Sequence, residues 1–265
     1  MPNQYVSTRT RSTTTADTSG EETERLDKCN WSKWLSAVKR AIHWPEPPPE
    51  PPTDPFLELW EAIDTVGGFL APNQERWLYE AAKATPANGL IVEVGSFLGR
   101  STVSMAFGCL ETARRIVAID TFEGNSDDFI NGKNNVSWEG SDFFNVFWQH
   151  LTARDLAVYV IPIRGMSHDV GRMWSAPINL LFLDGSHNYE DVKQDLELFL
   201  PWVIPGGCVA LHDVTEGWPG VFRVWDEIAK PALVQHGNVG SLSYGFKPSI
   251  RDDELSHIKE MPAKD

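Results

Sequence analysis

The sequence has few cysteines, a shortage of basic residues and no long apolar segment, and each of these features excludes a class of protein. Its 265 residues include only three cysteines, Cys29, Cys109 and Cys208, which are widely spaced and form no Cys-x-x-Cys pair. The chain therefore predicts neither a disulfide framework nor a zinc finger, and it indicates a reducing, cytoplasmic environment. No apolar run approaches the roughly 18–20 residues that span a bilayer, and no signal-peptide pattern is present, so no membrane partner is expected.

Basic residues are outnumbered by acidic ones. The chain has 23 Lys and Arg against 37 Asp and Glu, which gives a net charge of −14. Proteins that bind DNA or RNA neutralise phosphates with clustered Lys and Arg side chains. An acidic chain offers no such surface, so nucleic acid is excluded as the main partner.

Composition divides the chain into five segments. They are a disordered Ser/Thr-rich tail at 1–25, an amphipathic helix at 26–44, a proline-rich linker at 45–55, a compact domain at 56–250 and a C-terminal tail at 251–265. The first tail has too few apolar residues to offset the entropy of ordering, and clustered prolines favour an extended linker. The helix packs on the compact domain, covers the substrate as a lid, or forms the contact of a homo-oligomer, and the sequence leaves these three alternatives open.

Apolar segments rich in β-branched residues alternate with helical segments inside the compact domain. The predicted strands are 90–94, 116–119, 157–161, 178–183, 208–211 and one near 241–246. The predicted helices are 56–66, 72–84, 99–112, 141–152, 167–174, 188–200 and 219–234. Strands that are apolar throughout belong to a parallel sheet covered on both faces, and alternation of strand and helix is typical of a doubly wound α/β fold. We therefore expect a mostly parallel, Rossmann-like sheet with helices on both faces.

The segment after the first predicted strand indicates a ligand-binding turn. Gly95 and Gly99 permit a tight turn, and the helix that follows offers unpaired N–H groups at its start. The spacing is Gly-x-x-x-Gly, not the Gly-x-Gly-x-x-Gly of a dinucleotide site, and Glu93 stands two residues before Gly95. A carboxylate is a poor neighbour for a pyrophosphate and a good one for a cation. This pattern argues against an oxidoreductase with a nicotinamide cofactor.

Acidic residues follow four of the five predicted strand ends that we compare. Ligands of open α/β sheets bind at these carboxyl ends. Asp120 ends the second strand, 25 residues after Gly95, and is placed to bind the two hydroxyls of a ribose. The ligand implied is a nucleoside without phosphate and with a positive centre. S-adenosylmethionine (SAM) has both properties.

Five motifs at these strand ends carry a family resemblance. They are VEVGSFLGRST (92–102), AIDTFEG (118–124), LLFLDGSHNYEDVKQDL (180–196), PGGCVALHD (205–213) and VGSLSYGF (239–246). Together they resemble the class I SAM-dependent methyltransferases, and within them the small-molecule O-methyltransferases of sugar and natural-product pathways. Residues 1–85 have no counterpart that we can name. The resemblance implies transfer of a methyl group from SAM to a hydroxyl of a small molecule.

The resemblance assigns cofactor contacts residue by residue. The methionine part of SAM is implied to contact residues around the first strand end, namely Glu93, Gly95, Ser96, Gly99, Arg100 and Ser101. Asp120 is implied to hold the ribose. The adenine is implied to contact residues after the second and third strands, namely Thr121, Phe122, Gly165, Met166 and Ser167. Asp184, after the fourth strand, is also assigned to the cofactor side.

The resemblance further implies a reaction centre at the fourth and fifth strand ends. Some relatives hold a divalent metal with one acid after the fourth strand and an acid pair after the fifth. They also use a histidine three residues beyond the first acid as a general base. Asp184 and His187 match this layout, whereas His212 replaces one acid of the pair beside Asp213. Mg²⁺ prefers oxygen ligands, and an imidazole ligand suits Mn²⁺, Fe²⁺ or Zn²⁺ better.

Two alternatives stay open for this centre. Either Asp184, His212 and Asp213 hold a divalent metal, Mg or Mn, or His187 and His212 act without metal as base and orienting group. His187 has the further alternative of capping the helix that follows it. For the whole chain, a hydroxylase-like member of the same branch and a non-catalytic SAM-binding protein are the alternatives to a methyltransferase. Trp218 is a candidate contact for the acceptor.

Overall fold

The structure is a computed structural model that describes residues 54–124 and 142–249, together with Lys33. Four predicted segments lie wholly or largely outside these residues: the tail at 1–25, the helix at 26–44, the linker at 45–55 and the C-terminal tail at 251–265. The described helices and strands belong to one compact unit that begins at Thr53. They start at Pro55 and end at Phe246, close to the limits predicted for the compact domain.

A seven-stranded sheet runs through the described residues in the order β3-β2-β1-β4-β5-β7-β6. The strands are β1 (Leu90–Val94), β2 (Arg115–Asp120), β3 (Val160–Arg164), β4 (Ile178–Leu183), β5 (Val203–Leu211), β6 (Val234–Val239) and β7 (Leu242–Phe246). β1 to β5 are parallel, and β7 pairs antiparallel with β5 and β6. The predicted doubly wound α/β fold is confirmed. The strand order reverses between β1 and β4, which is where such sheets bind ligands.

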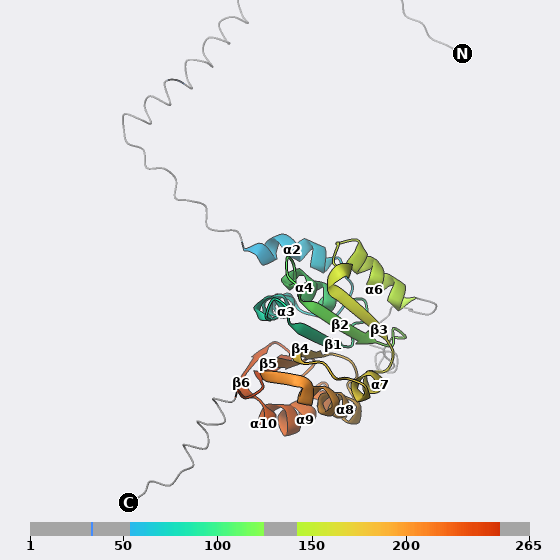
Figure 1. The fold of residues 1–265 in the computed structure, drawn as a ribbon, viewed down its shortest axis with the longest axis vertical. Coiled ribbons are helices and arrows are strands. Elements are labelled where there is room, and N and C mark those ends of the chain that lie inside the picture. The colour runs from blue at the N-terminus through green and yellow to red at the C-terminus, as the bar shows by residue number, and fades with distance from the viewer. Residues whose placement is uncertain (1–32, 34–53, 125–141, 250–265) are drawn as a thin grey trace, which may run out of the picture. The chain divides into compact units, whose positions relative to one another are not determined.

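Helices cover both faces of the sheet (Figure 1). On one face lie α2 (Pro55–Asp64), α3 (Pro72–Ala84), α4 (Arg100–Gly108) and α6 (Phe143–Thr152). On the other lie α7 (Ser167–Arg172), α8 (Tyr189–Phe199), α9 (Pro219–Val224) and α10 (Lys230–Ala232). Local sequence explains where helices begin: Asp54 caps α2 by accepting from the N–H of Phe56, and Gln74 caps α3 by accepting from the N–H of Ala71.

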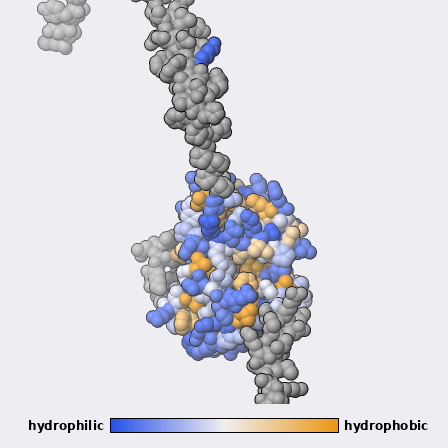
Figure 2. Space-filling view, turned by 90° about the vertical axis from the view of Figure 1, so that its left-hand side faces the viewer, coloured by the Kyte–Doolittle hydropathy of each residue, from blue (hydrophilic) through white to orange (hydrophobic). Residues whose placement is uncertain are grey.

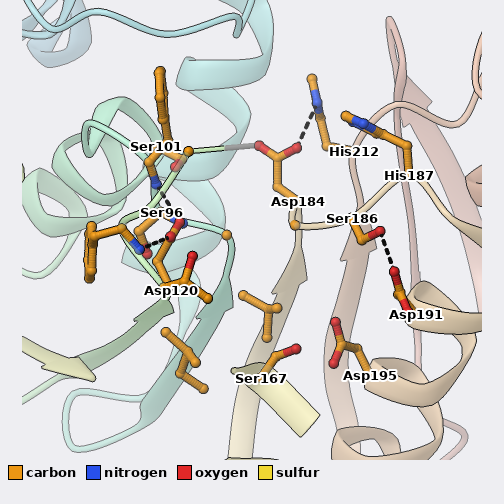
Figure 3. Close-up of a pocket in the computed structure, with 18 of the residues that line it drawn as sticks. Ser96, Ser101, Asp120, Ser167, Asp184, Ser186, His187, Asp191, Asp195 and His212 are labelled. Atoms are coloured by element: carbon orange, nitrogen blue, oxygen red, sulfur yellow. Dashed lines mark hydrogen bonds and ion pairs between the residues drawn. The ribbon is translucent and has the colours of Figure 1, made fainter. Parts of the chain in front are cut away.

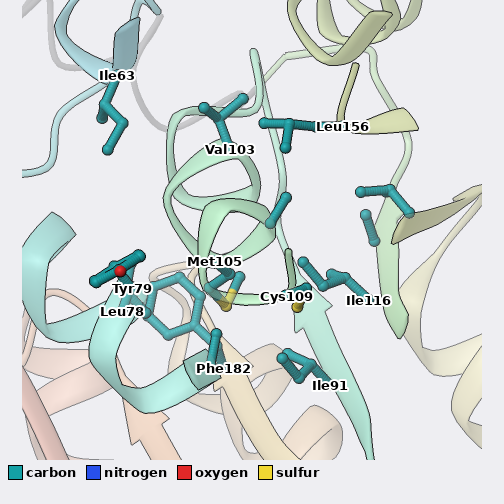
Figure 4. Close-up of a cluster of buried hydrophobic side chains, with 14 of the residues drawn as sticks. Ile63, Leu78, Tyr79, Ile91, Val103, Met105, Cys109, Ile116, Leu156 and Phe182 are labelled. Atoms are coloured by element: carbon teal, nitrogen blue, oxygen red, sulfur yellow. The ribbon is translucent and has the colours of Figure 1, made fainter. Parts of the chain in front are cut away.

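The strands are apolar throughout because both faces of the sheet are buried. Successive residues of a strand point to opposite faces, and in β1 Ile91 joins one core cluster while Val92 joins the other. On the first face Phe182 of β4 packs in one cluster with Leu78 of α3 and Met105 of α4 (Figure 4). Burying each such side chain contributes about 1.5–3 kcal/mol. The two cores fix the strands whose ends carry the acids.

Several predicted elements differ from the structure; the fifth strand, predicted over 208–211, already begins at Val203. The third strand was expected over 157–161 but begins at Val160, because Ala157–Tyr159 form a 3₁₀ turn before it. The helix expected over 219–234 is interrupted by a π-helical turn at Trp225–Ala229. β6 was not predicted, since its sequence VQHGNV has no apolar alternation and the strand forms by pairing with β7 at the sheet edge.

The surface of the described residues is mainly polar on the face in Figure 2, where apolar side chains form small separate groups. The apolar residues that are exposed include Leu57, Phe69, Val158 and Met173, which come from different elements. Within 54–124 and 142–249, none of the helices combines the length and apolar character needed to cross a bilayer.

Candidate functional site

A cavity of about 880 Å³ opens at the carboxyl edge of the sheet. Its lining comes from the segments that follow β1, β2, β3, β4 and β5, joined by residues 67–70 between α2 and α3. In Figure 3, Ser96, Ser101 and Asp120 lie at one side of the cavity, and Asp184, His187 and His212 lie at another. The structure thus brings the two predicted groups of site residues into one cavity.

The turn between β1 and α4 is fixed by Asp120 from β2. One carboxylate oxygen of Asp120 accepts from the N–H groups of Ser96 and Phe97, each at 2.8 Å, and the other accepts from the N–H of Phe122. Three charge-assisted hydrogen bonds hold the carboxylate against two loops. Gly95 has a φ of +87° in this turn, a conformation that favours glycine. Asp120 therefore shapes the turn as well as lining the cavity.

Glu93 lies beneath the cavity and is not in its wall. Its side chain is 0% exposed and accepts hydrogen bonds from the hydroxyls of Ser96, Ser101 and Thr102. Burial raises the pKa of Glu93 to about 7, although the three hydroxyl donors oppose the rise. In this structure Glu93 supports the loop from below, and its contact with the methionine part of the cofactor stays a prediction.

Arg100 is held by the helices that precede β1. Its guanidinium pairs with Glu75 and with Asp64, and it also donates to the carbonyl of Val66. Burial opposes the cation, but these hydrogen bonds and charges outweigh it and raise the pKa of Arg100. Arg100 still lines the cavity, so it links the wall of the site to α2 and α3.

The side of the cavity assigned to adenine is lined as expected, and two acids that the sequence analysis did not assign join it. Thr121, Phe122, Gly165, Met166 and Ser167 all line the cavity. Asp191 and Asp195 of α8 face it as well, and the hydroxyl of Ser186 donates to Asp191 at 2.9 Å. Burial raises the pKa of Asp195 to about 6. The helical spacing of these two acids in the motif at 180–196 could have revealed them.

The predicted reaction centre forms at the ends of β4 and β5. Nδ1 of His212 lies 3.1 Å from a carboxylate oxygen of Asp184 and 3.1 Å from one of Asp213. Burial disfavours the imidazolium form of His212, but the two acids outweigh it and raise its pKa. Asp213, which follows His212 in the chain, has a φ of +57°. Asp tolerates this left-handed conformation better than most residues other than glycine.

The donor set of this cluster fits a divalent ion. Nδ1 of His212 is buried, and neither carboxylate meets it in hydrogen-bond geometry despite the short distances. One ligand atom each from Asp184, His212 and Asp213 lie within 4.8 Å of one another. Two donors bound to one ion at about 2.1 Å and at a right angle lie roughly 3 Å apart. A nitrogen atom left without a hydrogen-bonding partner is what a metal ligand requires.

His187 joins the same cluster from the loop after β4. Its Nε2 lies 3.1 Å from a carboxylate oxygen of Asp213, and its ring stacks on Trp218 with 3.9 Å between ring centroids. Burial opposes ionisation of Asp213, yet the hydrogen bond from His187 and the neighbouring charge of His212 hold the pKa of that carboxyl well below its usual range. His187 therefore contacts a carboxylate and an aromatic face.

Two contributions to the site came from segments that the sequence analysis left unassigned. Gln74 of α3 is buried, and its Oε1 lies 3.2 Å from Nε2 of His212. Phe69, between α2 and α3, stacks on Phe97, which in turn packs against Phe143, and all three line the cavity. Gln74 and Phe69 lie before the first motif, so no motif pointed to them.

Comparison with known proteins agrees with this geometry. Residues 92–214 match the family model described as "Methyltransferase domain", from within β1 to the residue after Asp213. The uncharacterized protein y4gI of Sinorhizobium fredii is 27% identical over 164 residues, which cover 58% of this chain and 17% of that protein. The chain thus spans less than a fifth of the length of this curated relative.

Solved structures of O-methyltransferases share the fold. TomG from Streptomyces achromogenes, involved in tomaymycin synthesis and solved in complex with SAM, is 18% identical with a TM-score of 0.51, covering 73% of this chain and 96% of TomG. The O-methyltransferase from Bacillus cereus in complex with SAH is 17% identical with a TM-score of 0.51, covering 80% of this chain and 97% of that one.

The sheet order, the cavity at the reversal of strand order and the family match point the same way. Residues 92–214 match a methyltransferase domain, and the described sheet has the fold of the solved O-methyltransferases. The resemblance drawn from the five sequence motifs is thereby confirmed.

Proposed function

We propose that this chain transfers a methyl group from SAM to a hydroxyl of a small molecule, such as a sugar or a natural product. The observation that carries the proposal is that one cavity contains both the Asp120-bound turn and the Asp184–His187–His212–Asp213 cluster. A methyl transfer needs a nucleoside site beside a group that accepts a proton, and the cavity offers residues suited to both tasks.

The residues proposed to hold SAM are those of the turn and of the segments after β2 and β3. Gly95 and Ser96 border the side assigned to methionine, Asp120 the ribose, and Phe122 and Ser167 the adenine. When bound, SAM supplies the methyl group as a sulfonium. The acids around the cavity favour a cationic ligand over a phosphorylated one. Alignment of the reacting groups by such a site supplies several kcal/mol of the rate enhancement.

His187 is proposed to accept the proton of the acceptor hydroxyl. Its Nε2 faces Asp213 at 3.1 Å, which favours the tautomer with hydrogen on Nε2 and makes Nδ1 the accepting nitrogen. A carboxylate that orients a histidine is a common arrangement for a general base. Trp218 keeps the imidazole in place by stacking on it, and its position at the cavity wall supports the proposed acceptor contact.

Asp184, His212 and Asp213 are proposed to hold a divalent metal ion. A metal at this position would lower the pKa of a bound hydroxyl and orient the acceptor. The cluster supports this proposal because its buried nitrogen and its two carboxylates supply three converging donors. Without metal, His212 stays paired with the two acids, and His187 alone accepts the proton.

Calorimetric titration with SAM in the presence of EDTA, Mg²⁺ or Mn²⁺ tests the cofactor and the metal. SAM binding supports the proposal, and absence of binding under all three conditions contradicts it. A heat of Mn²⁺ binding that disappears in Asp184→Asn supports the metal site. Incubation with a panel of hydroxyl-bearing sugars and phenols, read by mass spectrometry, tests the reaction: a gain of one methylene supports it, and a gain of one oxygen favours the hydroxylase alternative.

We further propose that the chain works in a reducing compartment, the cytoplasm, because Cys109 and Cys208 are both free and buried. Free buried thiols are typical of proteins that never meet an oxidising environment. Fractionation of cells that express the chain tests this location. The self-association expected as an alternative for the helix at 26–44 stays a prediction, which light scattering of the full chain would check.

A further inference from the structure

Gln74 contacts the reaction centre from outside the cavity. It lies in the first turn of α3, more than a hundred residues before His212 in the sequence, and its side chain is buried. Its Oε1 is 3.2 Å from Nε2 of His212. None of the proposed functions above depends on Gln74, and no sequence motif includes it.

Three neighbours fix the orientation of the Gln74 amide. Its Nε2 donates to the carbonyl of Val239 at 3.2 Å and to the hydroxyl of Ser241 at 2.9 Å. Its Oε1 accepts from the backbone N–H of Ala71 at 2.8 Å. A flipped amide would set its oxygen against the Val239 carbonyl and its NH₂ against the Ala71 N–H. The oxygen of Gln74 therefore faces His212.

This orientation determines which nitrogen of His212 carries hydrogen. The Gln74 oxygen can only accept, so a 3.2 Å contact is favourable only when Nε2 of His212 is the donor. The hydroxyl of Ser241, 3.3 Å from the same Nε2, can also accept from it. With hydrogen on Nε2, the neutral form of the ring, which is the form that binds a metal, has its lone pair on Nδ1. That is the nitrogen 3.1 Å from both Asp184 and Asp213 and without a hydrogen-bonding partner.

We propose that Gln74 is a positioning residue that holds His212 in the Nε2–H tautomer, so that Nδ1 is presented as a ligand for a divalent transition metal between Asp184 and Asp213. The inference rests on the metal site proposed above. A hydrogen-bond acceptor on the outer nitrogen of a metal-binding histidine fixes the ring and raises its basicity as a ligand. With one imidazole among three protein donors, the site prefers Mn²⁺, Co²⁺ or Zn²⁺ over Mg²⁺.

The fold explains why the acceptor comes from α3. His212 follows the last residue of β5, and the β6–β7 turn lies beside it because β7 pairs with β5. Gln74 bonds to both Val239 and Ser241 of that turn, so α3 and the turn are joined behind the histidine. The Gln74 side chain thus joins α3 to the β6–β7 turn and also selects the tautomer of His212.

Two variants separate the tautomer role from a structural role. Gln74→Met keeps the approximate length of the side chain and removes the acceptor. Ser241→Ala removes a hydrogen bond to the Gln74 amide and the longer, 3.3 Å contact to Nε2 of His212, but leaves the Gln74 oxygen in place. The full chain, freed of metal with a chelator, is titrated calorimetrically with Co²⁺, and its unfolding midpoint is measured without metal to compare the two losses of stability.

We expect Gln74→Met to weaken Co²⁺ binding by about 10–100-fold, the usual effect of removing the partner of a metal-binding histidine, and Ser241→Ala to stay within about threefold of the wild type. Unchanged affinity in Gln74→Met overturns the inference. Equal weakening in both variants also overturns it, because the state of His212 would then not depend on the Gln74 oxygen in particular. Tighter binding of Mg²⁺ than of Co²⁺ by the wild type contradicts the proposed metal preference.

A measurement on the wild type keeps the inference testable if Gln74→Met does not fold. Nitrogen NMR of the Zn²⁺-loaded chain with ¹⁵N-labelled histidine reports which ring nitrogen carries hydrogen, and the His212 signals are identified by their loss in His212→Gln. Hydrogen on Nε2 supports the inference, and hydrogen on Nδ1 overturns it. Failure to bind either metal overturns the metal site together with the inference, while SAM binding in the same samples decides the methyltransferase proposal separately.

Discussion

A side chain on Gly95 would overlap the carbonyl group of Asp184, so the turn after β1 and the reaction centre after β4 touch at a glycine. The two strand ends are also joined by a hydrogen bond from the N–H of Asp184 to the carbonyl of Val94 at 2.8 Å. This contact sets how closely the turn assigned to the cofactor approaches the acid assigned to the metal. The proposed cofactor site and the proposed reaction centre therefore meet at the backbone of Gly95.

Replacing Gly95 by Ala should lower the free energy of unfolding by about 3 kcal/mol or more, because left-handed strain and overlap with backbone atoms add together. Gly206→Ala is a matched control, since Gly206 also has a positive φ, +78°, but a methyl group there meets no atom within 4 Å. Urea unfolding of both variants, with SAM titration of each, checks this prediction. Equal stabilities of the two variants would contradict the close approach at Gly95.

Asp120→Asn should weaken SAM binding at least about tenfold, which corresponds to about 1.4 kcal/mol. An amide has one accepting oxygen, so it cannot keep the bonds to the N–H groups of Ser96, Phe97 and Phe122 together. Asp142→Asn is the control, because Asp142 only caps α6 and Asn caps helices equally well. Calorimetry that finds the same SAM affinity in both variants would remove Asp120 from the site.

His187→Ala should reduce the rate of methyl transfer at least about a hundredfold, the usual scale for a lost general base. The affinity for SAM should stay close to that of the wild type, because His187 is not among the residues proposed to hold SAM. His236→Ala is the control, since His236 is exposed on β6 and is not part of the cavity lining. Steady-state rates measured with an accepted substrate decide the matter, and a His187→Ala enzyme of normal rate would exclude this base.

The contribution of Glu93 to the free energy of unfolding should fall as pH rises. Its pKa is raised from 4.5 to about 7 in the folded chain, so between these values the folded state binds more protons than the unfolded state. Folding stability due to Glu93 is therefore lost progressively from pH 4.5 to pH 7, by on the order of 3 kcal/mol. Glu93→Gln should lack this part of the pH dependence, as urea unfolding in EDTA between pH 5 and pH 8 would reveal.

The control for this experiment is Glu61→Gln, at an exposed position of α2. Its unfolding should follow the pH dependence of the wild type, since the other buried acids are present in both proteins. If Glu93→Gln also follows the wild type, the Glu93 carboxyl is not protonated in the folded chain at mildly acidic pH.

The sequence by itself determined the architecture and the place of the site. Five segments apolar throughout predicted a parallel sheet buried on both faces, because side chains of such strands have no solvent face on which to place polar groups. Acids directly after those strands had to meet at one edge of the sheet. Asp120, Asp184, His212 and Asp213 were found this way and His187 through the family resemblance, and all five line the cavity.

Only the tertiary structure decided what surrounds these residues. β6 carries no local pattern and forms only through pairing with β7, and Gln74 reaches His212 from a helix more than a hundred residues away. The same holds for Glu93, which supports the loop after β1 through three hydroxyl groups. It also holds for Arg100, which pairs with acids of α2 and α3. Periodicity records which face of an element is buried, but the partner of a buried polar group is chosen by packing between distant segments.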